Sequence, residues 1–106
     1  MIISSYYNPM DQIPKENVLA ASEGLKAVAH EIRLSVLCLL LNGPMTVSEL
    51  LEATGAEQTN LSKHLSKMRL LGLLETEKQG NFIQYRIANP DWGDVITALK
   101  KIYCPD

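Results

Sequence analysis

The chain has 106 residues and a mass of 11.8 kDa, which is enough for one folded domain. Apolar residues make up 46% and charged residues 21%, a globular balance that excludes a disordered or fibrous chain. No segment approaches the roughly 20 apolar residues of a membrane helix, and the first residues lack the basic and apolar regions of a secretory signal. We therefore expect a cytoplasmic protein with no membrane partner.

Charge is unevenly distributed along the chain, whose net charge is −2. Residues 1–57 hold three basic and seven acidic side chains, whereas residues 58–86 hold five basic and two acidic ones. A basic segment in an otherwise acidic chain is typical of a DNA-binding surface. Chance variation of a solvated surface gives the same excess, so charge alone leaves both interpretations open.

The first half of the chain predicts an arm followed by two helices. Residues 1–13 predict a loose N-terminal arm, and residues 14–106 a single domain. A helix is expected from Pro14 to Ala29, because proline is tolerated near a first helical position. His30 begins a second helix, which ends at Leu41 before Asn-Gly-Pro. We expect His30 to cap or pack at this junction.

Two short helices are expected next. Thr46 and Glu49 fit a capping box at the start of the first, which ends at Thr54-Gly55. The second is expected from Gln58 to Leu71. Its apolar residues have the spacing of one buried face: Leu61, Leu65, Met68 and Leu71.

After Gly72 the apolar period changes to two. Residues 73–78 and 82–87 predict strands joined through Gln79-Gly80-Asn81, and glycine first in a two-residue turn favours a type II′ hairpin. Asn89 then caps a last helix, to about Tyr103. The apolar stripe of that helix needs a second surface, so we expect a dimer that uses the first and last helices. Its predicted interface residues are Trp92, Val95, Ile96, Leu99, Ile102 and Tyr103.

Two short helices followed by a β-hairpin are the order of a winged helix-turn-helix. We predict a mostly α fold of about five helices with a β-hairpin wing. A helix fits the major groove, where small polar side chains reach base edges and lysines neutralise phosphates. The candidate DNA-binding residues are Gln58, Thr59, Asn60, Ser62, Lys63, Lys67, Lys78 and Asn81. A solvated polar face on a small helical domain is the alternative, and the position of the hairpin argues against it.

Five segments resemble the ArsR/SmtB family of repressors. They are Leu25-Lys-Ala-Val-Ala-His-Glu-Ile-Arg-Leu34, Thr46-Val-Ser-Glu-Leu50, Gln58-Thr-Asn-Leu-Ser-Lys-His-Leu65 with Leu70-Leu-Gly-Leu-Leu74, and Phe82-Ile-Gln-Tyr-Arg-Ile87. The resemblance covers roughly residues 15–104, and its Gln-x-x-x-Ser-x-His-Leu block is fairly specific. It implies a homodimeric repressor, and we expect double-stranded DNA with an inverted-repeat operator as its partner.

The resemblance also assigns roles by position. It implies that Gln58, Thr59, Ser62, Lys63 and His64 are recognition-helix residues and that Arg86 is a wing contact. His64 borders the buried face, so a structural hydrogen bond stays open beside a DNA contact.

Glu57 departs from the family pattern, which commonly has a serine cap at this position. A carboxylate suits a helix N-terminus, but it would repel a nearby phosphate.

Members of this family often sense metals through a Cys-x-Cys pair before the recognition helix, or through Asp, His and Glu on the last helix. Residues 46–51 hold no cysteine, and the last helix holds no histidine. The two histidines and two cysteines lack the spacing of a tetrahedral zinc site. We expect no metal and no cofactor. Without a Cys-x-x-Cys pair or a Gly-rich phosphate loop, an enzyme is not expected either.

The remaining chemistry belongs to Cys38 and Cys104. A persistent disulfide is unexpected in a reducing cytoplasm. Helical geometry places Cys38 on the polar side of its helix, at a boundary of the core. If the last helix continues to Cys104, Lys100 and Lys101 lie beside it and favour the thiolate.

The pair is similar in position to the cysteines of the reactive-sulfur-sensing branch of the family, the HlyU, BigR and SqrR type. In that branch persulfides or oxidants link the two cysteines. The resemblance therefore implies that Cys38 and Cys104 are redox-sensing residues and that a reactive sulfur species or oxidant is the inducer. Two alternatives stay open: a constitutive DNA-binding regulator with inert cysteines, and a winged-helix protein-interaction module without DNA binding.

Overall fold

The computed structural model describes residues 13–104, so most of the expected N-terminal arm lies outside the described residues. The described part contains five helices and three strands, which agrees with the predicted fold class. In chain order they are α1 (Lys15–Val28), α2 (Glu31–Leu40), β1 (Met45–Thr46), α3 (Val47–Thr54), α4 (Gln58–Leu70), β2 (Leu74–Gln79), β3 (Phe82–Ile87) and α5 (Pro90–Tyr103).

The core lies where α2, α3, α4, β2 and α5 meet. Its largest fully buried side chains are Leu37, Leu50, Leu61, Leu65, Met68, Leu74, Ile96 and Val36. The predicted buried face of α4 is confirmed for three of its four residues, but the fourth, Leu71, is 48% exposed. The prediction for Leu71 is wrong because α4 ends at Leu70 and Leu71 is its C-cap, one position beyond the packed turns.

The wing is an antiparallel hairpin of β2 and β3. Leu74 pairs with Ile87 at its base, and Gln79 pairs with Phe82 next to the turn. Gly80, the first central residue of the turn, has a φ of +61°. Asn81, the second, has a negative φ, because no non-glycine residue of the described chain has a positive one. This combination is the one that the expected type II′ turn requires. β1 adds a third strand beside β3. No sequence pattern predicted β1, because a two-residue strand is too short to show a period.

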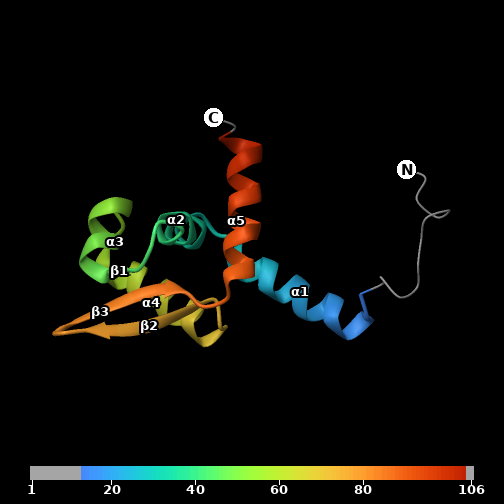
Figure 1. The fold of residues 1–106 in the computed structure, drawn as a ribbon, viewed down its shortest axis with the longest axis horizontal. Coiled ribbons are helices and arrows are strands. Elements are labelled where there is room, and N and C mark those ends of the chain that lie inside the picture. The colour runs from blue at the N-terminus through green and yellow to red at the C-terminus, as the bar shows by residue number, and fades with distance from the viewer. Residues whose placement is uncertain (1–12, 105–106) are drawn as a thin grey trace.

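α5 begins where Asn89 caps it, its side-chain oxygen accepting from the N–H of Asp91 at 2.9 Å. Its first half packs on α2, where Gly93 lies against Leu41 and Ile96 is buried. Its last turn is exposed. Figure 1 shows α1 and α5 projecting in different directions from a body of α2, α3, α4 and the sheet. Within residues 13–104, no helix has the length and apolar character needed to cross a membrane.

Candidate nucleic-acid interface

Local capping fixes the two helices of the helix-turn-helix. Thr46 Oγ1 accepts from the N–H of Glu49 at 3.2 Å, and Glu49 Oε1 accepts from the N–H of Thr46 at 2.8 Å, which confirms the capping box. Gly55 then ends α3 in the left-handed region, with a φ of +68°. This turn lets α4 begin three residues later at an angle to α3.

α4 separates its apolar and polar residues onto two faces. Leu61, Leu65 and Met68 are buried and anchor the helix. The other face is exposed and carries a shallow groove lined by Gln58, Thr59, Ser62, Lys63, Ser66, Lys67 and Leu70. The structure therefore brings together five of the predicted residues. Asn60 is exposed on the same helix, outside that groove.

Two residues of this groove, Ser66 and Leu70, are not among the predicted DNA-binding residues, although the helical period places Ser66 on the polar face of α4. Leu70 is 85% exposed, although it is apolar. Its position outside the i, i+4, i+7 stripe of α4 was the available signal.

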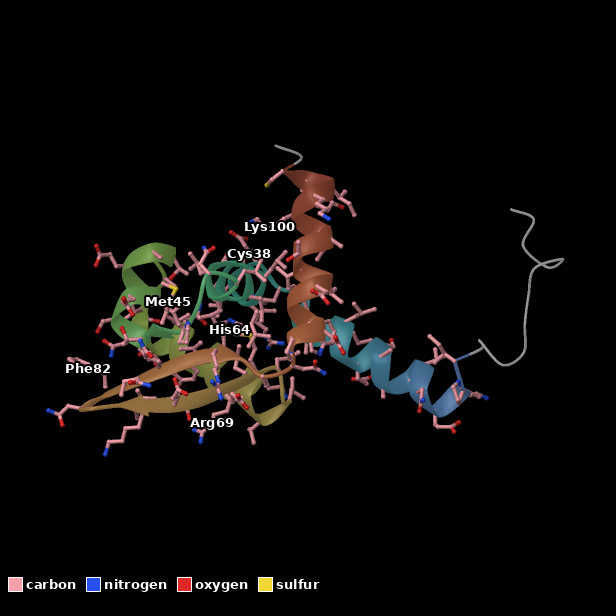
Figure 2. All side chains as sticks on the ribbon, in the orientation of Figure 1. Cys38, Met45, His64, Arg69, Phe82 and Lys100 are labelled. Carbon is pink, nitrogen blue, oxygen red and sulfur yellow. The ribbon has the colours of Figure 1, made fainter. Side chains whose placement is uncertain are left out.

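The tip of the wing presents the predicted Lys78 and Asn81 to solvent. Phe82, next to the turn, is 67% exposed, and Figure 2 shows it near the wing tip, well away from His64 in the body of the molecule. The strand pattern alone did not predict an exposed aromatic ring at this position.

Arg86, the predicted wing contact, is already occupied by two carboxylates. Its Nε donates to Glu75 Oε1 at 2.7 Å and its Nη1 to Glu77 Oε2 at 3.3 Å. The strand register places Glu75 directly opposite Arg86, so this pairing is built into the hairpin. The DNA contact of Arg86 stays a prediction.

Glu57 is the N-cap of α4, a position that suits a carboxylate. Its Oε1 accepts from the N–H of Asn60 at 3.0 Å. This backbone hydrogen bond is the main cause that lowers the pKa of Glu57 from its ordinary value, with hydrogen bonds to Thr59 and the charge of Lys63 adding to it. The carboxylate therefore remains charged at the edge of the candidate interface.

His64 makes the structural hydrogen bond that the sequence left open. Its Nδ1 accepts from Arg33 Nε at 3.1 Å, and its side chain is half-buried. Burial lowers its pKa, and the nearby His30 and Arg33 lower it further. A DNA contact of His64 stays a prediction.

His30 is the N-cap of α2, because its Nδ1 accepts from the N–H of Ile32 at 3.1 Å. This confirms the capping role that we expected at the helix junction.

Both cysteines are free thiols. Cys38 is half-buried, which agrees with the predicted boundary position, and it lines a groove between α2 and α3 together with Glu31, Leu34, Ser35, Leu39, Ala53 and Thr54. Cys104 is exposed. α5 ends at Tyr103, as predicted, and Cys104 is its C-cap, with its N–H donating to the Lys100 carbonyl. The helix therefore does not continue to Cys104, which was the condition for aligning this thiol with Lys100 and Lys101. The closeness of the two sulfur atoms stays a prediction.

Over residues 13–104, no three His, Cys, Asp or Glu side chains gather as metal ligands would.

Comparison with known proteins identifies the family. Residues 30–76 match the model of bacterial regulatory proteins of the arsR family. The chain is 39% identical over 82 residues to the HTH-type transcriptional regulator YgaV of Escherichia coli K12, covering 76% of this chain and 83% of that protein. It is 35% identical over 97 residues to the transcriptional activator HlyU of Vibrio cholerae, covering 91% and 90%.

Solved structures agree with this assignment. HlyU from Vibrio cholerae has a TM-score of 0.80 at 34% identity, over 86% of this chain and 99% of that one. The repressor BigR from Xylella fastidiosa has a TM-score of 0.73 at 29% identity, over 87% and 98%. The homodimeric winged helix-turn-helix DNA-binding domain Mb0332 from Mycobacterium bovis has a TM-score of 0.73 at 28% identity, over 88% of each chain. These relatives are regulators and not enzymes, and the chain belongs to the ArsR family of bacterial regulatory proteins, in its HlyU and BigR branch.

Proposed function

We propose that the chain is a homodimeric transcriptional repressor that binds an inverted-repeat operator in the cytoplasm. This proposal rests on the contrast between the buried apolar face of α4 and its exposed polar face. The buried leucines of α4 fix the helix to the core, while its exposed face presents small polar side chains and two lysines, Lys63 and Lys67. These are the side chains that contact base edges and phosphates when a helix lies in the major groove.

Exposed apolar side chains on α1 and α5 support the dimer. In the single chain, α1 exposes Val18, Leu19 and Leu25, and α5 exposes Val95, Ile102 and Tyr103. Apolar surface on two projecting helices is typical of a subunit interface. The relative Mb0332 is a homodimer, which supports the same assembly here. A dimer places two copies of α4 on one duplex, as an inverted repeat requires.

A salt titration tests DNA binding. A duplex is selected from a random library with the reduced protein, and its affinity is then measured against salt concentration. Lys63→Ala and Lys67→Ala should each lower the slope by about 0.9 for every phosphate that is no longer neutralised, and so by about 1.8 per dimer. Lys15→Ala, at the far end of α1, is the control and should leave the slope unchanged. Binding that is indifferent to salt would contradict the proposal and favour a protein-interaction module.

The cysteines are proposed to sense reactive sulfur. The position of Cys38 in a groove and the exposure of Cys104 support this role. A persulfide RSSH would oxidise the two thiols to a disulfide and be reduced to RSH and H₂S, which balances sulfur, hydrogen and electrons. Such a link between α2 and the end of α5 would change how the helices of the dimer are oriented, and with them the spacing of the two α4 helices.

Single cysteine variants test the sensing role. Persulfide should consume both thiols of the reduced protein and weaken its binding to the selected duplex, with a coupling of about 1–3 kcal/mol. Cys38→Ser and Cys104→Ser should bind the duplex but no longer release it, and mass spectrometry identifies the link. Release that persists in the double serine variant would show that the cysteines are inert in regulation.

A further inference from the structure

The two histidines of the chain lie side by side, although they belong to different helices. The sequence contains two histidines, His30 at the start of α2 and His64 on α4. Their ring centroids are 4.2 Å apart, with the ring planes tilted by 42°. Both imidazoles of this chain therefore lie where α4 meets the junction of α1 and α2.

Arg33 ties the two sides of this junction together. Its Nε donates to His64 Nδ1 at 3.1 Å, and its Nη1 donates to the carbonyl oxygen of Ala27 at 3.1 Å. Ala27 lies in the last turn of α1, and His64 lies in α4. One half-buried guanidinium thus connects α1 to the helix proposed to bind DNA.

Both imidazoles use Nδ1 as an acceptor. His64 accepts from Arg33, and His30 accepts from the backbone N–H of Ile32. A protonated imidazole has N–H donors at both nitrogens and no acceptor. Protonation of His64 at Nδ1 therefore removes the bond to Arg33 and places a positive charge against the guanidinium.

Within the described part of the chain, no nearby acidic group offsets the positive charge that a protonated His64 would carry. Arg33 lines a groove that also contains Glu23 and Lys26 of α1 and Lys67 of α4, and Glu23 is within 3.4 Å of Lys26. The acidic groups of the elements other than α1 are engaged elsewhere or exposed: Glu49 in the capping box of α3, Glu57 at the N-cap of α4, Glu75 and Glu77 of β2 on Arg86, and Glu31, Glu52, Asp91 and Asp94 in solvent. The charges that act on His64 are those of His30 and Arg33, both basic groups.

We propose that His64 is a positioning residue whose neutral imidazole, through Arg33, holds α4 against the end of α1, so that acid loosens α4 and weakens DNA binding. The predicted effect of acid on DNA binding rests on the proposed function, whereas the predicted loosening of α4 does not.

The direction of the pH dependence follows from linkage. The folded-state pKa of His64 lies below the ordinary value of 6.5, because burial and two basic neighbours disfavour the charged form. The stabilisation is therefore complete above the ordinary value. It is lost as the pH falls below that value toward the folded-state pKa, because the unfolded chain takes up the proton first. A His64 that contacted phosphate directly would give the opposite result, since its protonation would add positive charge and tighten binding.

The first experiment needs no DNA. Amide exchange of α4, corrected for intrinsic rates, and the imidazole titrations are followed by NMR from about pH 8 to about pH 5.5, the range in which histidine titrates. In the unmodified protein, α4 should open more as the pH falls. His64→Gln, which keeps an acceptor and does not titrate, should flatten this response. His30→Asn is the matched control, because asparagine keeps the α2 cap and the response of α4 should persist.

Arg33→Met separates positioning from mere packing. Arg33→Met removes both hydrogen bonds of Arg33, to His64 and to the Ala27 carbonyl. Losing the one that reaches α4 should raise α4 exchange at about pH 8 by roughly 2- to 10-fold, and the pKa of His64 should rise toward its ordinary value. The proposal is overturned if Arg33→Met leaves the His64 titration unchanged, or if α4 of His64→Gln opens with acid as readily as the unmodified protein. Should His64→Gln not fold, the Arg33→Met titration decides.

The second experiment uses the selected duplex at constant salt. Acid should weaken binding by the unmodified protein more than binding by His64→Gln. Binding that tightens with acid in the unmodified protein alone would overturn the proposal in favour of a direct phosphate contact. Failure of both proteins to bind any duplex at about pH 8 would instead contradict the proposed function, and the exchange results would still decide the role of His64.

Discussion

At the scale of single residues, Glu57 stabilises the start of α4 but places a negative charge on the candidate DNA-binding surface. Its carboxylate caps α4 and, because its pKa is lowered, stays charged beside side chains proposed to meet phosphate. The stabilisation that its charged form gives is present above the ordinary carboxyl pKa of 4.5. It is lost as the pH falls through the folded-state pKa.

Replacing Glu57 by serine should keep the cap and remove the charge. We expect Glu57→Ser to bind the selected duplex more tightly, with nearly unchanged thermal stability at neutral pH and a weaker loss of stability in acid. Binding isotherms and thermal melts at several pH values measure this. Glu16→Ser removes the same charge in the first turn of α1 and should not tighten binding. Equal affinities of Glu57→Ser and the unmodified protein would mean that this edge of α4 does not approach phosphate.

At the scale of elements, the wing pairs the cation of Arg86 on β3 with two carboxylates of β2. Arg86 and its two carboxylates are roughly 36–45% exposed, and such exposed ion pairs contribute only about 0–1 kcal/mol each. The pairs therefore do little for stability, but they offset the charge that a phosphate would meet.

Freeing Arg86 should strengthen DNA binding. In the double variant Glu75→Gln with Glu77→Gln, two negative charges leave the wing and the guanidinium is available to phosphate. We expect tighter binding and a steeper salt dependence, with a loss of folding stability of no more than about 1–2 kcal/mol. Arg86→Met in the same background is the control and should cancel the gain. If affinity does not change, Arg86 is a structural residue of the hairpin.

At the scale of the whole molecule, α1 and α5 leave the body with apolar side chains uncovered. Leu99, central in the predicted interface, is half-buried and packs against the core of its own chain. Ile102 is 66% exposed in the single chain. Ile102 is therefore the sharper probe of assembly, because changing it does not disturb the core.

Ile102→Asp should give a folded monomer. Burying an unpaired carboxylate between subunits costs several kcal/mol, more than a small interface tolerates. Sedimentation measures the mass and circular dichroism the fold, while Thr97→Asp, an exposed change on the same helix, should leave the dimer intact. A dimer that survives Ile102→Asp would place the interface elsewhere.

Features that depend on neighbours within a few positions could be predicted from the amino-acid sequence. The Thr46–Glu49 capping box, the glycine of the wing turn and the cap of α5 all follow from such local patterns, and so does the order of elements that defines the winged helix. The polar face of α4 follows from its period. These features are local because a cap or a turn is closed by atoms only two to four residues away.

Features that depend on residues distant in the chain came only from tertiary packing. β1 exists because β3 lies beside it, and Arg86 is paired with carboxylates of the opposite strand. The bond from Arg33 to His64 joins helices that the sequence separates by two further elements. No period or spacing encodes such a contact, because it forms only when the packing of α2 against α4 brings the two side chains within hydrogen-bonding distance.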